Sequence, residues 1–451
     1  MAGPQSQQEI PSVRLDRRLA TPLFRQVYQR IREAILDGTL PPGASLPSTR
    51  SLAGQLSTAR GTIELAYALL AGEGYVVGRA AAGTVVNPGL SQLSMLARGQ
   101  TLAGKLTGPR LDFARAQPAH AFQMGLPALD AFPRYARLRQ AIARYLAIAR
   151  GISCSTGQIL ITAGYQGALG LIARTLLVPG DAVWFENPGY FRARDALATA
   201  GATIVPVPVD RDGLDIRLAR ERSPKARLVV VTPSHQCPLG VTLSLPRRLE
   251  LLAWAAKTRA WIIEDDYDSE FRYLGRPLPA LKGLDDAGRV FYAGSFSKVL
   301  NPGLRLGYLV VPLSEVDRFY RAAELFAPSS SLLDQMVVAD FMIEGHFARH
   351  LRRMRRLYAA RRDALVSALR TVFDDRLALD VPAGGMHVIG RFSGRRNDAA
   401  LAERAQREGL ALLSSCLVGR PSELGLLLSF TNIPVEEATR EAQRLHRLLF
   451  R

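Results

Sequence analysis

Apolar residues in the first quarter of the chain follow helical spacing. Every fourth residue from Leu23 to Ile35 is apolar, and charged residues lie between them. This period places the apolar side chains on one face of a helix, and Gly38 is a suitable residue to end it. The pattern therefore predicts an amphipathic helix at the start of a first domain.

Two more helices and a hairpin are predicted before residue 88. Ser48 is a suitable N-cap for a short helix that continues through Leu56, and Ser57 or Thr58 for the helix after it. The apolar face of that next helix consists of Ile63, Ala66, Tyr67 and Leu70. Two β-rich runs, 75–77 and 84–86, then flank a turn rich in glycine and alanine. Helix, short helix, helix and hairpin is the outline of a winged helix-turn-helix.

The larger part of the chain alternates short apolar runs with helical segments. The runs lie at 159–162, 182–185, 228–231, 261–264 and 290–294. Continuous apolar strands separated by helices predict an α/β domain whose mostly parallel sheet is covered on both faces. Residues 89–110 have no clear period and are expected to be a linker. We therefore predict a DNA-binding domain at 16–88 and a second domain at 111–451.

Composition fits a multidomain protein with a polyanionic partner. The chain has 451 residues, of which 48% are hydrophobic and 22% charged. Its net charge is 58 − 40 = +18, and the excess is spread along the whole chain. Cys154, Cys237 and Cys416 are odd in number and widely spaced, which argues against a disulfide framework or a zinc site. No signal peptide or membrane-spanning run is visible, so a soluble, cytoplasmic protein is expected.

A lysine next to the last apolar run is the strongest candidate for chemistry. Lys298 follows Ser295, and Arg305 comes seven residues later. A lysine held beside a strand can bind a carbonyl, and nearby hydroxyls and a cation can bind the phosphate of a phosphorylated aldehyde. These residue types at this spacing indicate a site for pyridoxal phosphate.

Other polar residues follow the predicted strands, where ligands gather in a parallel sheet. Asp265 could keep a pyridine nitrogen protonated, and Tyr267 could bind the phenolic oxygen of the ring. Taken alone, this acidic run also fits a loop that binds nothing or a divalent-metal cluster. The turn before the helix at Tyr165 and Gln166 could hold phosphate on its backbone N–H groups. Tyr190 could stack on the ring, although a packing tyrosine is an equal alternative.

Residues 21–88 resemble the GntR family of bacterial regulators. The similarity is carried by several short runs: 22–24, 42–43, 46–50, 52–53, 66–67, 73–75 and 83–86. It implies DNA binding through Arg50, Arg60, Thr62 and Gly83, with Arg60 in the major groove. A guanidinium can bind guanine or phosphate, whereas each arginine taken alone would more often be a solvated residue. Ala59 replaces the usual serine or threonine, and Gly61 weakens the helix by roughly 1 kcal/mol relative to alanine.

The chain from about Leu111 resembles the aminotransferase-like half of the MocR subfamily, which has the fold type I of pyridoxal-phosphate enzymes. The motifs are 188–192, 232–236, 264–271 and 295–307. The resemblance implies that Lys298 forms the internal aldimine and that Asp265 and Tyr267 face the ring. It also implies that Tyr165, Gln166, Ser295 and Arg305 hold the phosphate, that Tyr190 stacks on the ring, and that Arg192 anchors an acidic effector group.

Three departures from that family bear on catalysis. The run 132–139 lacks a helix and a loop that border the substrate site in relatives. Cys237 stands where catalytic relatives often have asparagine, and Leu427 stands where many carry the arginine that binds the substrate carboxylate. A leucine cannot bind a carboxylate.

Two functions follow from these features. The first is a homodimeric transcriptional regulator that senses a small amino compound, or pyridoxal phosphate itself, through Lys298. The alternative is an active aminotransferase with an appended DNA-binding domain. A scaffold that has lost its cofactor is less consistent with the intact Lys298 and Asp265.

Overall fold

The computed structural model describes residues 15–16, 22–36, 38–72, 75–79, 83–88, 136–274, 279–326, 331–392, 403, 407 and 425–450. The chain divides into two compact units. The first comprises Met1–Arg110, Gln140–Cys154 and Val338–Arg352, and the second comprises Leu111–Arg139, Ser155–Val337 and Arg353–Arg451. The predicted linker at 89–110 lies outside the described residues, so the predicted domain boundaries stay predictions.

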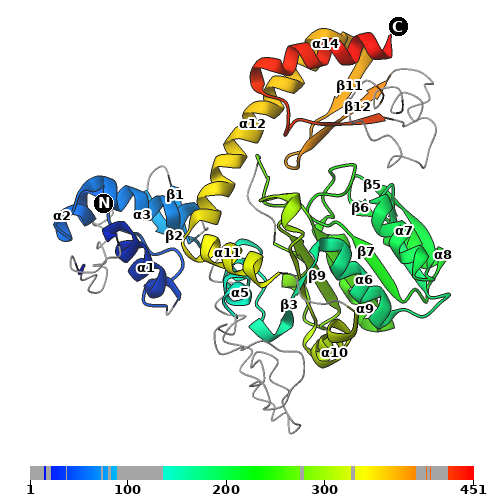
Figure 1. Cartoon of the computed structure of the whole chain (residues 1–451), viewed down its shortest axis with the longest axis horizontal. Coiled ribbons are helices and arrows are strands. Elements are labelled where there is room, and N and C mark those ends of the chain that lie inside the picture. Colours follow the sequence, from blue (N-terminus) through cyan, green and yellow to red (C-terminus); the bar gives the residue numbers. More distant parts are fainter. Residues whose placement is uncertain are drawn as a thin grey trace, which may run out of the picture. The chain divides into compact units, whose positions relative to one another are not determined.

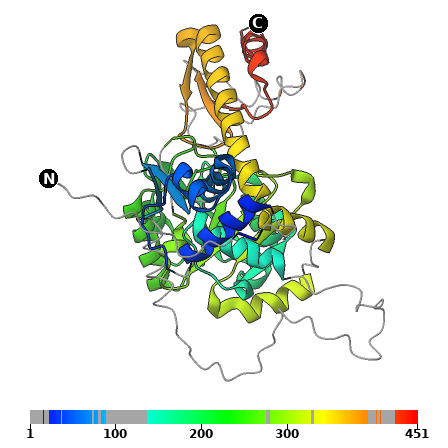
Figure 2. The same cartoon turned by 90° about the vertical axis from the view of Figure 1, so that its left-hand side faces the viewer.

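The amino-terminal part of the first unit contains three helices and a hairpin (Figure 1 and Figure 2). They are α1 (Leu23–Leu36), α2 (Thr49–Gln55), α3 (Arg60–Gly72), β1 (Val76–Arg79) and β2 (Gly83–Val86). The two strands pair antiparallel, with Val76 opposite Val86. Helix α1 ends two residues before Gly38, whose φ of 85° suits glycine. The order and type of these elements confirm the sequence prediction.

Packing in this region follows the predicted apolar faces. Ile63, Ala66, Tyr67 and Leu70 of α3 are all buried in one cluster with Val27 and Ile31 of α1. The Ser48 side chain accepts a hydrogen bond of 3.1 Å from the backbone N–H of Ser51, which confirms the predicted cap of α2. Helix α3 begins at Arg60, so a cap at Ser57 or Thr58 lies too early. Ser57 has a positive φ of 48° and belongs to the turn instead.

An eight-stranded sheet forms the centre of the second unit (Figure 1). Its strands, in the order β3-β10-β9-β8-β7-β4-β5-β6, are β3 (Ile159–Thr162), β10 (Gly307–Val310), β9 (Val290–Ser295), β8 (Trp261–Asp266), β7 (Leu228–Val231), β4 (Ala182–Asn187), β5 (Thr203–Asp210) and β6 (Gly213–Leu214). Strands β9, β8, β7, β4 and β5 pair in parallel. Strand β10, which the sequence analysis did not predict, runs antiparallel to both β3 and β9.

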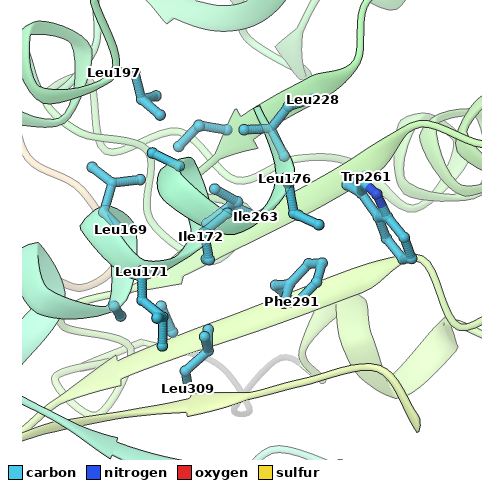
Figure 3. Close-up of a cluster of buried hydrophobic side chains, with 14 of the residues drawn as sticks. Leu169, Leu171, Ile172, Leu176, Leu197, Leu228, Trp261, Ile263, Phe291 and Leu309 are labelled. Atoms are coloured by element: carbon cyan, nitrogen blue, oxygen red, sulfur yellow. The ribbon is translucent and has the colours of Figure 1, made fainter. Parts of the chain in front are cut away.

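Alternate residues of the same strand belong to different cores. Leu228 and Val230 of β7 join one buried cluster, whereas Val229 and Val231 join another. Since successive side chains of a strand point to opposite faces, both faces of the sheet are covered, as predicted. Figure 3 shows the first cluster, in which side chains of α6 pack on the sheet. The flanking helices are α6 (Gly164–Leu176), α7 (Phe191–Thr199), α8 (Ile216–Arg222), α9 (Leu245–Thr258) and α10 (Val316–Phe326).

A second, three-stranded antiparallel sheet has the order β11-β12-β13. Its strands are β11 (Leu377–Asp380), β12 (His387–Phe392) and β13 (Gly425–Ser429), and the other helices are α5 (Arg137–Ala149), α11 (Leu332–Ile343), α12 (His346–Phe373) and α14 (Ala438–Leu449). The short 3-10 helices are η2 (Thr156–Gln158), η3 (Leu281–Leu284), η4 (Pro302–Leu304), η5 (Leu313–Glu315), η6 (Asp374–Arg376) and η8 (Val435–Glu437). Leu369, Val388 and Leu445 belong to one buried core that joins α12, this sheet and α14. None of the helices that the structure describes is long and apolar enough to cross a membrane.

Candidate functional site

Several predicted site residues meet at one edge of the large sheet. Gly307 of β10 lies opposite both Thr162, at the end of β3, and Ser295, at the end of β9. Asp265 lies near the end of the adjacent strand β8. The turns that follow these strands therefore come together, and Lys298 is in one of them. This is the edge at which parallel sheets bind ligands.

The start of helix α6 is built to hold an anion. Ala163 precedes the helix and supplies no side-chain cap, so the first backbone N–H groups have no side-chain acceptor there. The Tyr165 hydroxyl and the Gln166 amide nitrogen are buried without a hydrogen-bond partner among the described residues. A Cβ at Gly307 would lie 2.9 Å from Gly164 Cα, so only glycine permits this close approach of the two backbones. A phosphate group at this helix start would accept hydrogen bonds from its first backbone N–H groups.

Asp265 lies at the same edge, with an exposed fraction of 6%. Burial, above all, raises the pKa of its carboxyl well above the usual value, and the neighbouring carboxyls of Asp266, Glu186 and Asp268 add to the increase. The Tyr165 hydroxyl opposes this increase, although it makes no hydrogen bond of normal geometry. A protonated ring nitrogen beside Asp265 would offset the penalty of burying this charge.

Tyr190 stands directly before helix α7 and near Tyr165. The two ring centroids lie 6.3 Å apart. Burial raises the pKa of the Tyr190 hydroxyl, so the ring is neutral. Arg192, in the first turn of α7, is exposed, and its guanidinium lies 5.8 Å from the centroid of the Phe191 ring. The structure thus brings Tyr190 to Tyr165 and leaves Arg192 accessible.

The lysine segment follows strand β9. The Lys298 side chain is exposed, and its charge contributes to a lowered pKa of His387 in β12, so the two lie within electrostatic reach. Ser295 is half-buried, and its hydroxyl accepts a hydrogen bond of 3.1 Å from the backbone N–H of Ser297. Arg305 is exposed and has a φ of 47° at the end of η4. Among the described residues, no hydrogen bond or ion pair joins Lys298 to the start of α6.

A buried network shapes the loop after strand β7. Glu186 accepts hydrogen bonds from the Thr232 hydroxyl at 2.6 Å, the Thr232 N–H at 3.2 Å and the Gln236 amide at 3.2 Å. The same Gln236 amide donates to the Pro188 carbonyl at 2.8 Å. Burial raises the pKa of Glu186 to about 7, against the effect of these hydrogen bonds. No local pattern marks Glu186 as a site residue, although its partners Thr232 and Gln236 lie in the motif at 232–236.

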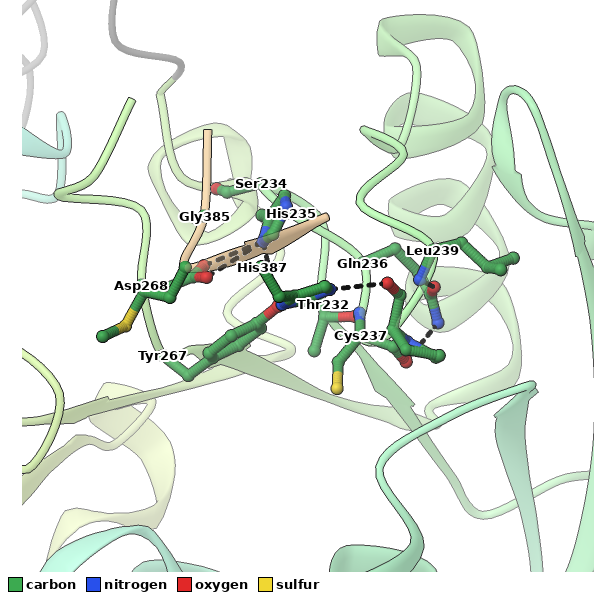
Figure 4. Close-up of polar contacts among 12 residues, drawn as sticks. Thr232, Ser234, His235, Gln236, Cys237, Leu239, Tyr267, Asp268, Gly385 and His387 are labelled. Atoms are coloured by element: carbon green, nitrogen blue, oxygen red, sulfur yellow. Dashed lines mark hydrogen bonds and ion pairs between the residues drawn. The ribbon is translucent and has the colours of Figure 1, made fainter. Parts of the chain in front are cut away.

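A second buried group surrounds Tyr267 (Figure 4). His235 Nδ1 lies 2.9 Å from the Tyr267 hydroxyl and 3.0 Å from Asp268 Oδ2. The ring of His387 is 5.6 Å from that of His235, and its Nε2 donates to the Pro238 carbonyl at 2.9 Å. No spacing in the sequence assigns a role to His387 or His235. Their proximity can be recognised only in the tertiary structure, because residues 235, 267 and 387 are far apart in the chain.

Leu427 lies in an apolar wall on the small sheet. It pairs with Ile389 across β12 and β13, and Phe191 and Leu239 pack against both. Its exposed fraction is 9%. The four side chains of this wall are apolar, and the Arg192 guanidinium lies over the ring of one of them, Phe191. Among the described residues, no group of three or more His, Cys, Asp or Glu side chains could hold a metal ion.

The predicted DNA-binding residues lie on the surface of the first unit. Arg50 and Arg60 are exposed, and Thr62 is half-buried. Arg60 Nε forms an ion pair of 2.8 Å with Glu64, one turn further along α3. Gly83 has a φ of 68° at the start of β2, and no atom lies within 4 Å of a Cβ built there. The segment at 132–135, where a helix and a loop were expected to be missing, lies outside the described residues.

Comparisons with known proteins match both halves of the chain. Residues 23–86 match the gntR family of bacterial regulatory proteins, and residues 112–425 match the class I and II aminotransferases. A probable rhizopine catabolism regulatory protein, MocR of Rhizobium meliloti, is 40% identical over 93% of this chain and 92% of its own. A pyridoxine biosynthesis transcriptional regulator, PdxR of Corynebacterium glutamicum, is 32% identical over 82% of this chain and 83% of its own.

Solved aminotransferases share the fold of the second half. A Pyrococcus horikoshii kynurenine aminotransferase, solved in complex with PMP, has a TM-score of 0.63 at 29% identity over 70% of this chain and 80% of its own. LysN of Thermus thermophilus, complexed with N-(5'-phosphopyridoxyl)-L-leucine, has a TM-score of 0.62 at 29% identity over 70% of this chain and 81% of its own. Together with the full-length regulators, these matches show that the chain belongs to the MocR-type transcriptional regulators of the GntR family, which join a GntR DNA-binding domain to a class I/II aminotransferase domain.

Proposed function

We propose that this regulator senses a small amino compound, or pyridoxal phosphate itself, through a cofactor bound to Lys298. The observation that carries the proposal is the start of α6, which has no side-chain cap and where, among the described residues, the buried Tyr165 hydroxyl and Gln166 amide nitrogen have no hydrogen bond of normal geometry. The Tyr165 hydroxyl lies near Asp265, and Gln166 lies near Tyr190. Burying such groups unpaired costs free energy, so their presence at the ligand-binding edge is best explained by a bound anion. Pyridoxal phosphate supplies that anion, together with an aldehyde that bonds an amine and a ring that withdraws electrons.

We assign one binding role to each residue around the start of α6 and the ends of the neighbouring strands. Tyr165, Gln166, Ser295 and Arg305 bind the phosphate, Asp265 binds the ring nitrogen, Tyr190 stacks on the ring and Tyr267 donates to the ring oxygen. Arg305 and Lys298 are exposed, and both lie in the segment that follows β9. Arg192 is accessible for an acidic group of the effector. An amine effector would compete with Lys298 for the aldehyde.

Regulation requires that the effector favours one arrangement of the DNA-binding domains. A ligand shifts such an equilibrium only by its difference in affinity for the two arrangements. We propose a homodimer that presents two GntR domains to two half-sites, with Arg60 of each at the major groove and Arg50, Thr62 and Gly83 beside it. The excess of basic residues, +18 over the chain, supports binding to DNA.

The alternative, an active aminotransferase with an appended domain, is supported by the 29% identity to solved aminotransferases. It needs a group that binds the substrate carboxylate, and Leu427 cannot supply one, which leaves Arg192, beside Phe191 of the same apolar wall, as the candidate cation among those described. Turnover of a panel of amino acids and oxo acids separates the two functions. Regulation predicts that effector binding changes DNA affinity without sustained turnover.

The first test is the visible absorbance of the purified protein with and without added pyridoxal phosphate. We expect a yellow band that borohydride bleaches, and no band in Lys298→Ala. Lys257→Ala, an exposed lysine in the same domain, is the matched control and should keep the band. A parent protein that stays colourless with added cofactor would overturn the sensing proposal, while DNA binding would remain.

A further inference from the structure

His235 sits behind Tyr267 in a position that can set the direction of the tyrosine's hydrogen bonds. We propose that His235 is a positioning residue: its Nδ1–H is shared between Asp268 and the Tyr267 oxygen, so that the Tyr267 proton points to the ring oxygen of the bound cofactor. This inference rests on the proposed function, because it assigns a task to residues around the same ligand. It concerns a histidine, and not Lys298 or the start of α6.

The geometry around Nδ1 decides which atom carries the proton. Nδ1 lies 2.9 Å from the Tyr267 oxygen and 3.0 and 3.1 Å from the two Asp268 oxygens. An ionised carboxylate only accepts hydrogen bonds. A bare Nδ1 would therefore face the carboxylate lone pairs, which is repulsive, whereas an Nδ1–H can donate to Asp268 and Tyr267 together.

The other ring nitrogen supports the same tautomer. Nε2 of His235 is buried and has no hydrogen-bond partner among the described residues. A proton on Nε2 would be a buried donor without an acceptor, and leaving such a donor unpaired is costly. With the proton on Nδ1, Nε2 is only an acceptor. Both nitrogens therefore favour Nδ1–H.

The direction of the tyrosine hydrogen bond follows. Because Nδ1–H occupies the side of the Tyr267 oxygen that faces His235, the tyrosine's own proton cannot point there. Burial, above all, raises the pKa of Tyr267 well above its usual value, and Asp268 adds to the increase, so the hydroxyl keeps its proton. When the Tyr267 oxygen accepts a hydrogen bond from His235, its own O–H becomes a stronger hydrogen-bond donor toward a third group. An anionic ring oxygen is the group that such a donor would stabilise.

The surroundings hold the imidazole in this place. His235 is 7% exposed, and Asp268 is 1% exposed. A Cβ at Gly385, which has a φ of +87°, would collide with the imidazole, so glycine leaves the space that the ring fills (Figure 4). The titratable groups described near the cluster are His387 across from His235, Lys298 near His387, Tyr273 near Asp268, and Cys237, Asp265 and Glu186 around Tyr267.

The test is a pH titration of the visible absorbance of the cofactor-loaded protein, with four variants. His235→Leu removes the donor, and His235→Asn keeps an N–H close to the position of Nδ1. Tyr267→Phe and the double variant His235→Leu/Tyr267→Phe complete a double-mutant cycle. Thermal unfolding of each variant verifies that it is folded.

We expect His235→Leu to raise the pH at the midpoint of the absorbance change by about one unit. Without His235 the Tyr267 hydroxyl is a weaker and less well-aimed donor, so it stabilises the anionic ring oxygen less and the cofactor holds its proton to higher pH. His235→Asn should restore most of the shift. In the Tyr267→Phe background, His235→Leu should change nothing further. The affinity for pyridoxal phosphate should fall in His235→Leu, should recover in His235→Asn, and should not fall further when His235→Leu is added to Tyr267→Phe.

Three results would overturn the inference: an unchanged midpoint in folded His235→Leu, a folded His235→Asn that behaves like the leucine variant, or shifts that add in the double variant. A parent protein without any band would overturn the proposed function as well. The two failures are thereby distinguished, since the inference alone fails only when the parent shows the band.

Discussion

The DNA-binding domain and the aminotransferase-like domain place their functional residues in opposite environments. Arg50 and Arg60 are exposed on a bundle of about seventy residues, and their side chains depend on little beyond their own helices. Asp265, Tyr267 and Glu186 are buried at the edge of a sheet assembled from segments more than a hundred residues apart. A surface site depends on local structure, whereas a buried polar site depends on the whole fold around it.

The largest expected effect is the loss of the cofactor from the buried site while the surface site keeps working. Lys298→Ala should abolish the borohydride-sensitive absorbance completely but leave the DNA-binding domain folded. Gel-shift assays on a fragment selected from random-sequence DNA should still detect binding by this variant. If Lys298→Ala also unfolds the GntR domain, the two sites are not independent, and the comparison fails.

The second prediction concerns how burial of the Glu186 carboxyl makes the free energy of unfolding depend on pH. Its pKa is raised from 4.5 to about 7, so the folded state keeps its proton at pH values where the unfolded state has lost it. Stability is therefore fully present below pH 4.5 and is lost as pH rises toward 7, by ~3 kcal/mol at most. The three tryptophans, Trp184, Trp254 and Trp261, all lie in this domain, so their fluorescence reports its unfolding.

Glu186→Gln is the matched variant, since it keeps the shape of the side chain and cannot ionise. Subtracting its pH profile from that of the parent removes the contributions of Asp265 and the other groups. We expect the parent to lose stability relative to Glu186→Gln between pH 4.5 and 7. Parallel profiles would show that Glu186 ionises normally in the folded protein.

The third prediction concerns the exposed arginine of α3. Arg60→Ala should weaken binding to a specific DNA site by about 2 kcal/mol, the usual range for a guanidinium that contacts a base. Its ion pair with Glu64 is exposed and contributes little to stability, so the fold should not change. Arg30→Ala is the control, because Arg30 forms a similar exposed pair with Glu33 on α1. Equal losses for both variants would indicate a general charge effect instead of base contact.

The smallest predicted effect is local to α2. Ser48→Ala should destabilise the start of this helix by ~1 kcal/mol, because it removes the cap bond to the Ser51 N–H. Ser244 precedes α9 with nearly the same backbone angles but makes no side-chain cap bond, so Ser244→Ala should have much less effect. Hydrogen exchange of residues 49–55 and 245–258 measures the two effects. Equal changes in the hydrogen-exchange protection of α2 and α9 would show that loss of the Ser48 cap bond is not the cause of the destabilisation.

The arginine-rich helix shows how far a local pattern can be interpreted. The sequence predicts a helix at 349–362, and α12 confirms it. Its seven arginines favour a solvated face paired with acidic neighbours over a second DNA contact. Arg353 and Arg356 are exposed, whereas Arg355 and Arg361 donate to the backbone carbonyls of Glu270 and Thr431, and Arg362 lies over the ring of Tyr273. These side chains support the fold of the domain, because acceptors from distant segments lie beside them.

The period of apolar residues was sufficient to predict the outline of a winged helix-turn-helix and the strands β4, β7, β8 and β9, since these patterns are local. It did not predict the parallel strand β5. Lys298, Asp265 and Tyr165 could be named as candidates because each follows a predicted strand. The antiparallel strand β10, the pairing of His235 with Tyr267 and Asp268, and the raised pKa of Glu186 were decided only by the tertiary structure. Burial and long-range contacts set these properties, and neither is encoded in the local spacing of residues.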